Sequence, residues 1–276
     1  MTASTPTTQY PLGSADAEHE RLIRQAQWLA PYTERFFRDA GIGPGQRVLD
    51  LGSGVGDVAL LAAKLVGPSG EVVGIERDTR SISRARARVA EAHVLNVSFI
   101  QSDVLQIPSD RPFDAAVGRY ILMFLPDPVT VLRSLVEVVR PGGVLAFQEA
   151  SWGSLLRHCA RLPLWASGIA MVVETFKRAG TNTEMGRDLS RVFQEVGLRS
   201  PSTRTDTLLG AEQWMPGVLE SLRPLMKQFG LSTAPLGDFA TLSERLHAEV
   251  AQSKAGTPLP DIIGVWARTP ADPKLR

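Results

Sequence analysis

The chain has 276 residues, a formal net charge of +1 and 43% hydrophobic residues, the composition of an ordinary globular protein. The near-neutral charge argues against nucleic-acid binding, which requires a clustered basic face. The single cysteine, Cys159, excludes an internal disulfide and a cysteine-based metal cluster, and no apolar stretch approaches the roughly 20 residues that cross a bilayer. We therefore expect a cytoplasmic protein without a membrane span. We expect no metal, because Asp, Glu and His show no ligand spacing.

The first predicted element is helical. Charged and apolar residues alternate at helical spacing over residues 16–40, and Pro31 should break or restart this helix. Because these residues precede the first predicted strand, we expect residues 1–40 to form an N-terminal helical cap. Residues 41–276 are predicted to form the main domain.

A glycine-rich turn follows the first predicted strand, over residues 47–51. Its glycines stand at positions 52, 54 and 56, and a helix begins next to Asp57. Glycine is needed where a ligand approaches the backbone closely, because a Cβ would block the approach. A dinucleotide fingerprint, G-x-G-x-x-G, would place a glycine where Asp57 stands, and a pyrophosphate at the helix N-terminus would be repelled by that carboxylate. The turn is therefore predicted to bind a nucleoside without a diphosphate.

Further strands are predicted at the spacing of βαβ units, over 71–76, 97–101, 113–118 and 143–149. The first of them ends in Glu76, 26 positions after Asp50. An acidic side chain at that place can accept hydrogen bonds from both hydroxyls of a ribose. The residues that end or follow the other three strands are Asp103, Val104, Arg119 and Glu149.

The second half of the chain is less regular. Residues 186–197 are typical of a last core helix, and strands are predicted over 198–208 and 261–268. Two stretches, at about 151–185 and 209–258, are predicted to be helical insertions, because compact domains seldom leave such lengths without structure. We expect them to cover the C-terminal edge of the sheet, where open α/β sheets bind ligands.

The order of these motifs resembles class I S-adenosylmethionine (AdoMet)-dependent methyltransferases, in the small-molecule branch that includes ubiquinone and menaquinone biosynthesis. The resemblance covers roughly residues 45–150. It implies a doubly wound, seven-stranded, mostly parallel α/β sheet of the Rossmann-like methyltransferase fold, with helical cap insertions and an antiparallel pair of strands at one edge. It also implies AdoMet as the cofactor.

The resemblance implies roles for residues of the glycine turn. Gly52, Ser53 and Gly54 are expected to contact the methionine portion through their backbone. Asp50 is expected to orient the turn or the ammonium of the cofactor, with a purely structural role at the strand end as the alternative. Glu76 is expected to bind the ribose hydroxyls.

The remaining cofactor contacts are expected at the ends of later strands. Arg77 is expected to lie against adenine, with plain solvent exposure as the alternative. Asp103 should accept a hydrogen bond from the adenine amino group, beside the backbone of Val104. Arg119 is expected to meet the cofactor beneath the transfer site, with a structural ion pair as the alternative.

A general base is needed only when the methyl acceptor enters protonated. His19 and Tyr10, in the N-terminal cap, and His158, in the first insertion, are candidate catalytic residues, although a lone histidine is more often structural. Glu149 ends the fifth strand and is a candidate base or amine anchor.

The sequence thus predicts a methyltransferase that moves a methyl group to O, N or C of a metabolite, partly apolar or aromatic, by in-line displacement at the sulfonium methyl. The motif order is also similar to that of enzymes of secondary metabolism, and a homodimer is a possible assembly. A protein that binds AdoMet without transferring methyl, such as a regulatory module or a cyclase-like enzyme, is the first alternative. An NAD-dependent oxidoreductase is the second, and Asp57 disfavours it.

Overall fold

Seven strands form a single sheet in the order β3-β2-β1-β4-β5-β7-β6. The computed structural model describes residues 10–13, 16–107, 110–153, 155, 159, 161–210, 214–253, 256–257 and 259–271. The strands are β1 (Arg47–Leu51), β2 (Glu71–Glu76), β3 (Val97–Gln101), β4 (Phe113–Arg119), β5 (Val139–Ser151), β6 (Ser202–Asp206) and β7 (Asp261–Arg268).

The helices alternate with the strands in the first half of the chain and gather in the second. They are α1 (Asp16–Asp39), α2 (Asp57–Val66), α3 (Thr79–Glu91), η1 (Leu122–Phe124), α4 (Pro128–Val138), α6 (Pro163–Arg178), α7 (Met185–Glu195), α8 (Met215–Gln228), η3 (Ala234–Leu236) and α9 (Leu242–Ser253). None of these described helices combines the length and the apolarity that crossing a membrane requires.

The sheet is parallel from β3 to β5, and β7 runs antiparallel to both of its neighbours, β5 and β6. This confirms the predicted mostly parallel α/β sheet with an antiparallel pair at its edge. The chain moves from β1 to β2 and β3 on one side and then returns to β4 on the other. The switch point between β1 and β4 is therefore the place where a sheet of this kind binds ligands.

Helices cover both faces of the sheet, so each face packs in a core of its own. Successive side chains of a strand point to opposite faces, and a central strand therefore contributes to both cores. Val48 packs in a core with α2, α3 and the end of α1, whereas Leu49 and Leu51 pack in a second core with α4 and α7. This double burial explains why central strands such as β1 are largely apolar, whereas the edge strand β6 is polar and mostly exposed.

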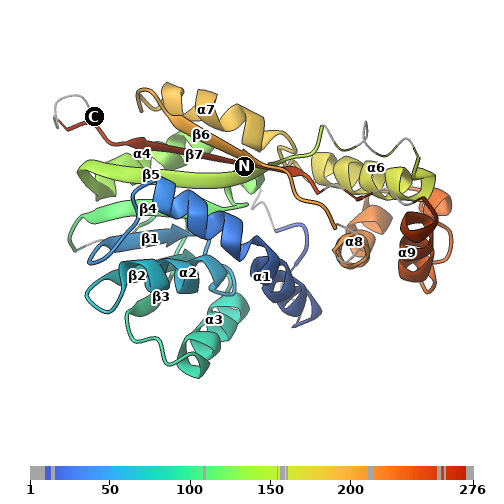
Figure 1. Ribbon diagram of the computed structural model, residues 1–276, viewed down its shortest axis with the longest axis horizontal. Helices are drawn as coiled ribbons and strands as arrows, with labels where there is room; N and C mark the ends of the chain where they lie inside the picture. Colours follow the sequence, from blue (N-terminus) through green and yellow to red (C-terminus); the bar gives the residue numbers. More distant parts are fainter. Residues whose placement is uncertain are drawn as a thin grey trace, which may run out of the picture.

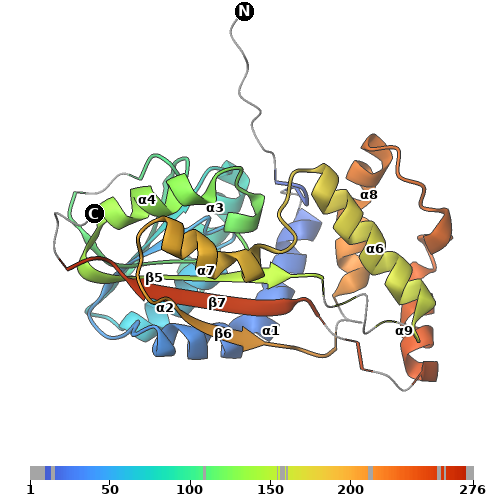
Figure 2. The same cartoon turned by 90° about the horizontal axis from the view of Figure 1, so that it is seen from above.

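Helices α6, α8 and α9 lie together beyond the carboxyl ends of the parallel strands (Figures 1 and 2). Glu249 of α9 accepts hydrogen bonds from the backbone N–H groups of Leu164 and Trp165, both at 2.8 Å, at the N-terminus of α6. A carboxylate is favourable there because it satisfies free amide donors and the helix dipole. These helices fall within the two predicted insertions.

The prediction that Pro31 ends or restarts the first helix was wrong. Helix α1 continues from Asp16 to Asp39 with Pro31 inside it. Residues on both sides of the proline are buried: Leu29 is 1% exposed, and Phe36 is fully buried and packs edge-on against Trp266 of β7, with ring centroids 5.7 Å apart. Burial along the whole helix outweighs the single hydrogen bond that the proline removes.

Candidate functional site

The glycine turn lies at the switch point of the sheet. All three of its glycines have positive φ, at 65° for Gly52, 51° for Gly54 and 84° for Gly56. A Cβ on Gly52 would lie 2.5 Å from the side chain of Ile121, whereas a Cβ on Gly54 would meet nothing within 4 Å. The open space beside Gly54 therefore lets a ligand approach the backbone closely.

The backbone amides of this turn are bound within the protein. Ser53 N donates to Ile75 O at 2.9 Å, Gly54 N donates to Glu76 Oε2 at 3.0 Å, and Gly56 N donates to Ser53 O at 2.8 Å. A diphosphate would need such amides as donors. Their engagement supports a ligand without a diphosphate. Asp57 adds less than expected from the sequence, because its Oδ1 is paired with Arg88 Nη1 at 2.7 Å.

Glu76 joins the glycine turn to the loop after β2. Its Oε1 accepts hydrogen bonds from the backbone N–H groups of Arg77, at 2.8 Å, and Asp78, at 2.9 Å, while its Oε2 accepts from Gly54. A carboxylate has about four acceptor sites, and these three bonds leave one of them, on Oε2, for a hydroxyl donor. The structure thus fixes this carboxylate beside the open space at Gly54.

The other predicted adenosine contacts lie at neighbouring strand ends. Arg77 is exposed, and the register of β2 and β3 pairs Glu76 with Gln101. Asp103 comes two residues beyond Gln101 and accepts a hydrogen bond from Leu105 N at 3.0 Å. Val104 is partly buried against the core. The structure therefore brings these residues to the same edge of the sheet as Glu76.

Two buried polar atoms at the turn are unsatisfied. Asp50 Oδ2 and Ser53 Oγ have no hydrogen-bond partner among the described residues, although Asp50 is only 1% exposed. Burial raises the pKa of Asp50 well above its usual range, and the positive charge of Arg119 offsets this in part. A ligand with hydrogen-bond donors or a positive charge would satisfy these atoms, as the methionine portion of AdoMet would. The residues present fit that cofactor.

The segment after β4 has a strained backbone. Arg119 donates from Nη1 to Thr33 Oγ1 of α1 at 3.0 Å. Tyr120 has a φ of 56°, which is unfavourable for a bulky side chain, and its N–H donates to Gln148 O at 2.9 Å. Such strain clusters at functional sites. Sequence reasoning missed Tyr120, because only a glycine would have signalled a left-handed backbone here.

Glu149 anchors the start of η1. It is fully buried, and its two oxygens accept hydrogen bonds from the backbone N–H groups of Ile121, at 3.0 Å, Leu122, at 2.8 Å, and Met123, at 3.3 Å. Burial raises the pKa of Glu149 to about 8, and these three bonds oppose the rise. The carboxyl group fixes the loop after β4, and its predicted role as a base stays a prediction.

The other base candidates, His19, Tyr10 and His158, differ in what the structure shows of their surroundings. His19 is 4% exposed, and its Nε2 lies 3.2 Å from Ser81 Oγ, so it joins α1 to α3. Burial raises the pKa of Tyr10, and the negative charges of Glu18 and Glu76 add to the rise. His158 lies outside the described residues.

A buried ion pair within α1, beside Tyr10, is hydrogen-bonded to α8. The Arg21 guanidinium contacts both oxygens of Glu18, at 2.7 and 2.5 Å, and Ser221 Oγ of α8 donates to Glu18 Oε2 at 2.8 Å. The side chains are 6% and 2% exposed. Sequence reasoning missed this pair because charged residues three positions apart on a helix are typical of its solvent-exposed face.

A row of five aromatic side chains crosses the region between the sheet edge and the outer helices. Successive ring centroids are 5.1 Å apart for Tyr10 and Phe124, 6.1 Å for Phe124 and Phe176, 5.8 Å for Phe176 and Trp152, and 5.7 Å for Trp152 and Trp214. We call these residues the aromatic row. It joins the N-terminal segment, η1 and α6 to Trp152, which follows β5, and to Trp214, which precedes α8.

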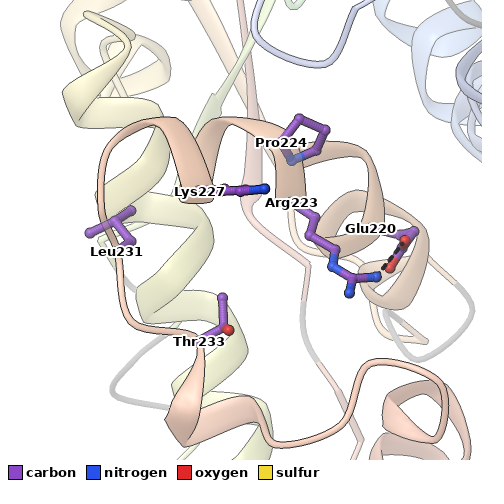
Figure 3. A pocket seen from close by; sticks show the side chains of 6 residues that line it. All are labelled: Glu220, Arg223, Pro224, Lys227, Leu231 and Thr233. Carbon is purple, nitrogen blue, oxygen red and sulfur yellow. Dashed lines mark hydrogen bonds and ion pairs between the residues drawn. The ribbon is translucent and has the colours of Figure 1, made fainter.

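A hollow of about 560 Å³ is lined by side chains of α8 and of the segment that follows it (Figure 3). The Arg223 and Lys227 side chains line it, and Arg223 Nη1 is 3.3 Å from Glu220. None of the residues predicted to bind the cofactor lines this hollow. The candidate site is therefore the carboxyl edge of the sheet and not the hollow.

The fold, with the candidate site at the carboxyl edge of its sheet, is that of a methyltransferase, and the comparison with protein families agrees. The model of a methyltransferase domain family matches residues 42–197, so the chain belongs to that family. It is 45% identical over 108 residues to the 2-phytyl-1,4-naphtoquinone methyltransferase of Synechococcus elongatus, a match that covers 38% of this chain and 46% of that protein. The match thus spans about half the length of this relative.

A longer match has lower identity. The chain is 26% identical over 188 residues to the demethylmenaquinone methyltransferase of Staphylococcus aureus, covering 64% of this chain and 77% of that protein. It is also 35% identical over 111 residues to the arsenite methyltransferase of Halobacterium salinarum, covering 40% of this chain and 28% of that protein.

Solved structures share the fold. A putative methyltransferase from Bacillus halodurans is 18% identical with a TM-score of 0.56, covering 86% of this chain and 97% of that one. The cyclase SpnF is 20% identical with a TM-score of 0.54, covering 89% of this chain and 82% of that one. At such identities the likeness establishes the fold alone.

Proposed function

We propose that this protein is an AdoMet-dependent methyltransferase that methylates a small molecule. Membership of the methyltransferase domain family supports the reaction class. The observation that carries the proposal is the link between Glu76 and Gly54, because it holds an acidic side chain beside an open, diphosphate-free turn at the switch point. That arrangement suits a nucleoside with two ribose hydroxyls.

Each part of the site has a role in binding this cofactor. Glu76 accepts from the ribose hydroxyls, Asp103 and Val104 bind the adenine edge, and Asp50 balances the positive charge of the methionine portion. When bound, AdoMet supplies a methyl group that its sulfonium makes electrophilic. The protein then has to hold a nucleophile in line and exclude water, and positioning of this kind lowers a barrier by several kcal/mol.

We infer that the acceptor is a partly apolar molecule, with a quinone-type ring as the leading class. The names of the quinone methyltransferase relatives support this class, and so does the aromatic row at the sheet edge. Tyr10 belongs to the aromatic row, but burial raises its pKa and makes it a poor base. His19 and Glu149 hold other elements together, so the identity of a base stays a prediction. A homodimer, a cytoplasmic location and the domain boundaries stay predictions.

The alternative, binding of AdoMet without methyl transfer, is not favoured. The likeness to the cyclase SpnF concerns the fold alone, whereas the methyltransferase relatives share up to 45% of their matched residues. Formation of S-adenosylhomocysteine separates the two functions.

The test is an incubation with methyl-labelled AdoMet and a panel of hydroxylated naphthoquinones. We expect S-adenosylhomocysteine and a labelled product in equal amounts, and much less of both with the E76A variant. Tight AdoMet binding without S-adenosylhomocysteine for any acceptor would favour the alternative.

A further inference from the structure

Two buried indole N–H groups of the aromatic row lack an acceptor among the described residues. Trp152 Nε1 and Trp214 Nε1 are shielded from solvent and find no hydrogen-bond partner in the described part of the chain. Their rings are neighbours, with centroids 5.7 Å apart and planes inclined by 35°. Buried donors in native proteins nearly always have partners. Trp165 Nε1 lacks a partner among the described residues as well, so it is the adjacency of the two donors in the aromatic row that points to one shared partner.

The two indoles lie at the same edge as the cofactor candidates. Trp152 directly follows β5, which ends at Ser151, and Trp214 directly precedes α8. Gln148 Oε1 of β5 is also buried without a partner among the described residues, and the register pairs Gln148 with Arg119 of β4. Together with Asp50 Oδ2 and Ser53 Oγ, these unsatisfied atoms extend from the glycine turn to α8.

The spacing of the indoles limits how a ligand can bind. A flat ring held between two others needs about 7 Å between them, twice the usual 3.5 Å contact distance between carbon atoms. The separation of 5.7 Å is too small, so a ligand does not insert between the indoles. An indole N–H lies in the plane of its ring, so a polar group of a ligand would meet these donors at the rim of the rings and not between them.

We propose that Trp152 and Trp214 form the acceptor subsite, where their indole N–H groups donate to an oxygen of a planar, largely apolar acceptor. The other rings of the aromatic row pack along that acceptor. The inference rests on the proposed function. An indole N–H only donates, so the group it binds must carry a free lone pair, as a carbonyl or an ionised hydroxyl does. An ammonium would leave both donors unpaired.

The first test removes each donor and keeps a ring. Calorimetry measures binding of 2-hydroxy-1,4-naphthoquinone to the full chain loaded with S-adenosylhomocysteine, for the wild type and the W152F, W214F and W165F variants. Trp165 is the matched control: its Nε1 is also buried and unpaired, but it lies in α6 outside the aromatic row. We expect W152F and W214F each to raise the Kd of the quinone about three- to tenfold. We expect W165F to leave it unchanged, and S-adenosylhomocysteine affinity to be constant throughout.

The second test uses the wild type alone, so it does not depend on how the variants fold. We expect 2-(aminomethyl)naphthalene, which presents an ammonium on the same ring system, to bind at least about tenfold more weakly than the quinone. Equal affinity for the two probes, no binding of the quinone, or an unchanged Kd in W152F and W214F would overturn the inference. Failure to bind S-adenosylhomocysteine would instead overturn the proposed function.

Discussion

Glu76 Oε2 accepts a hydrogen bond from the backbone N–H of Gly54 at 3.0 Å, so the end of β2 is tied to the turn after β1. The same carboxylate accepts two more backbone hydrogen bonds from the loop that leads into α3. One side chain therefore sets the shape of the turn and keeps an acceptor site for a ligand. This double role makes Glu76 the residue on which the proposed cofactor site depends most.

Replacing Glu76 by alanine should weaken AdoMet binding by about 1–3 kcal/mol, because hydrogen bonds to a charged group are lost. The E76Q variant keeps the size of the side chain and one acceptor oxygen, so its loss should be smaller. Calorimetric titration of both variants measures the difference. An AdoMet Kd for E76A equal to that of the wild type would remove Glu76 from the site.

Alanine at Gly54 and at Gly52 should have different effects. Both positions have positive φ, which costs about 1–2 kcal/mol of stability for a residue with a Cβ. At Gly52 the new Cβ would also collide with Ile121, so we expect a larger fall in the free energy of unfolding.

At Gly54 the methyl group would enter the open space, and we expect AdoMet affinity to fall about tenfold or more, a loss of about 1.4 kcal/mol. Urea unfolding and calorimetry of G54A and G52A separate the two effects. Unchanged cofactor affinity in a folded G54A variant would show that the ligand does not approach this backbone.

Glu149 should make stability depend on pH. Burial raises its pKa from 4.5, the value of a solvated glutamate, to about 8 in the folded protein, so between about pH 4.5 and 8 the unfolded chain loses a proton that the folded protein keeps. The contribution of Glu149 to the free energy of unfolding therefore falls as pH rises through that window. The total fall is on the order of a few kcal/mol, and the contribution is constant above about pH 8.

The E149Q variant cannot titrate at this position. Urea unfolding of the wild type and E149Q at pH 5, 6.5 and 8 should show a difference in unfolding free energy that changes with pH, because other groups cancel in the comparison. A difference that is the same at all three pH values would contradict the raised pKa of Glu149.

The buried pair of Glu18 and Arg21 should be strongly coupled. Removing one partner, in E18Q or R21M, leaves the other with its polar groups buried and incompletely paired, and such a loss costs about 3–5 kcal/mol. The double variant should lose much less than the sum of the two single losses. A double-mutant cycle by urea unfolding measures the coupling, and simple additivity would show that the two side chains do not act as a pair.

The strands and the glycine turn were predictable because local patterns determine them. An apolar run that ends in glycines identifies β1 and its turn, and the sequence prediction of 71–76 and 97–101 agrees with β2 and β3. The sixth strand is shorter than predicted, Ser202–Asp206 in place of 198–208. Leu198 packs in the core at the end of α7, and Ser200 has a positive φ, so the strand begins only after this turn.

The features that sequence missed depend on contacts between distant parts of the chain. The pattern around Pro31 contains no sign that both ends of α1 are buried by other elements. The position of His19 against α3 and the pairing of Arg21 with Glu18 under α8 are likewise visible only in three dimensions. The aromatic row brings together residues from five separate segments, so no local spacing could predict it.

Calorimetric titration of the wild-type protein with AdoMet and, in parallel, with NAD tests the central claim most directly. We predict saturable binding of one AdoMet per chain and no measurable heat from NAD, because the turn holds an adenosine without a diphosphate. Saturable binding of NAD together with no binding of AdoMet would contradict the account.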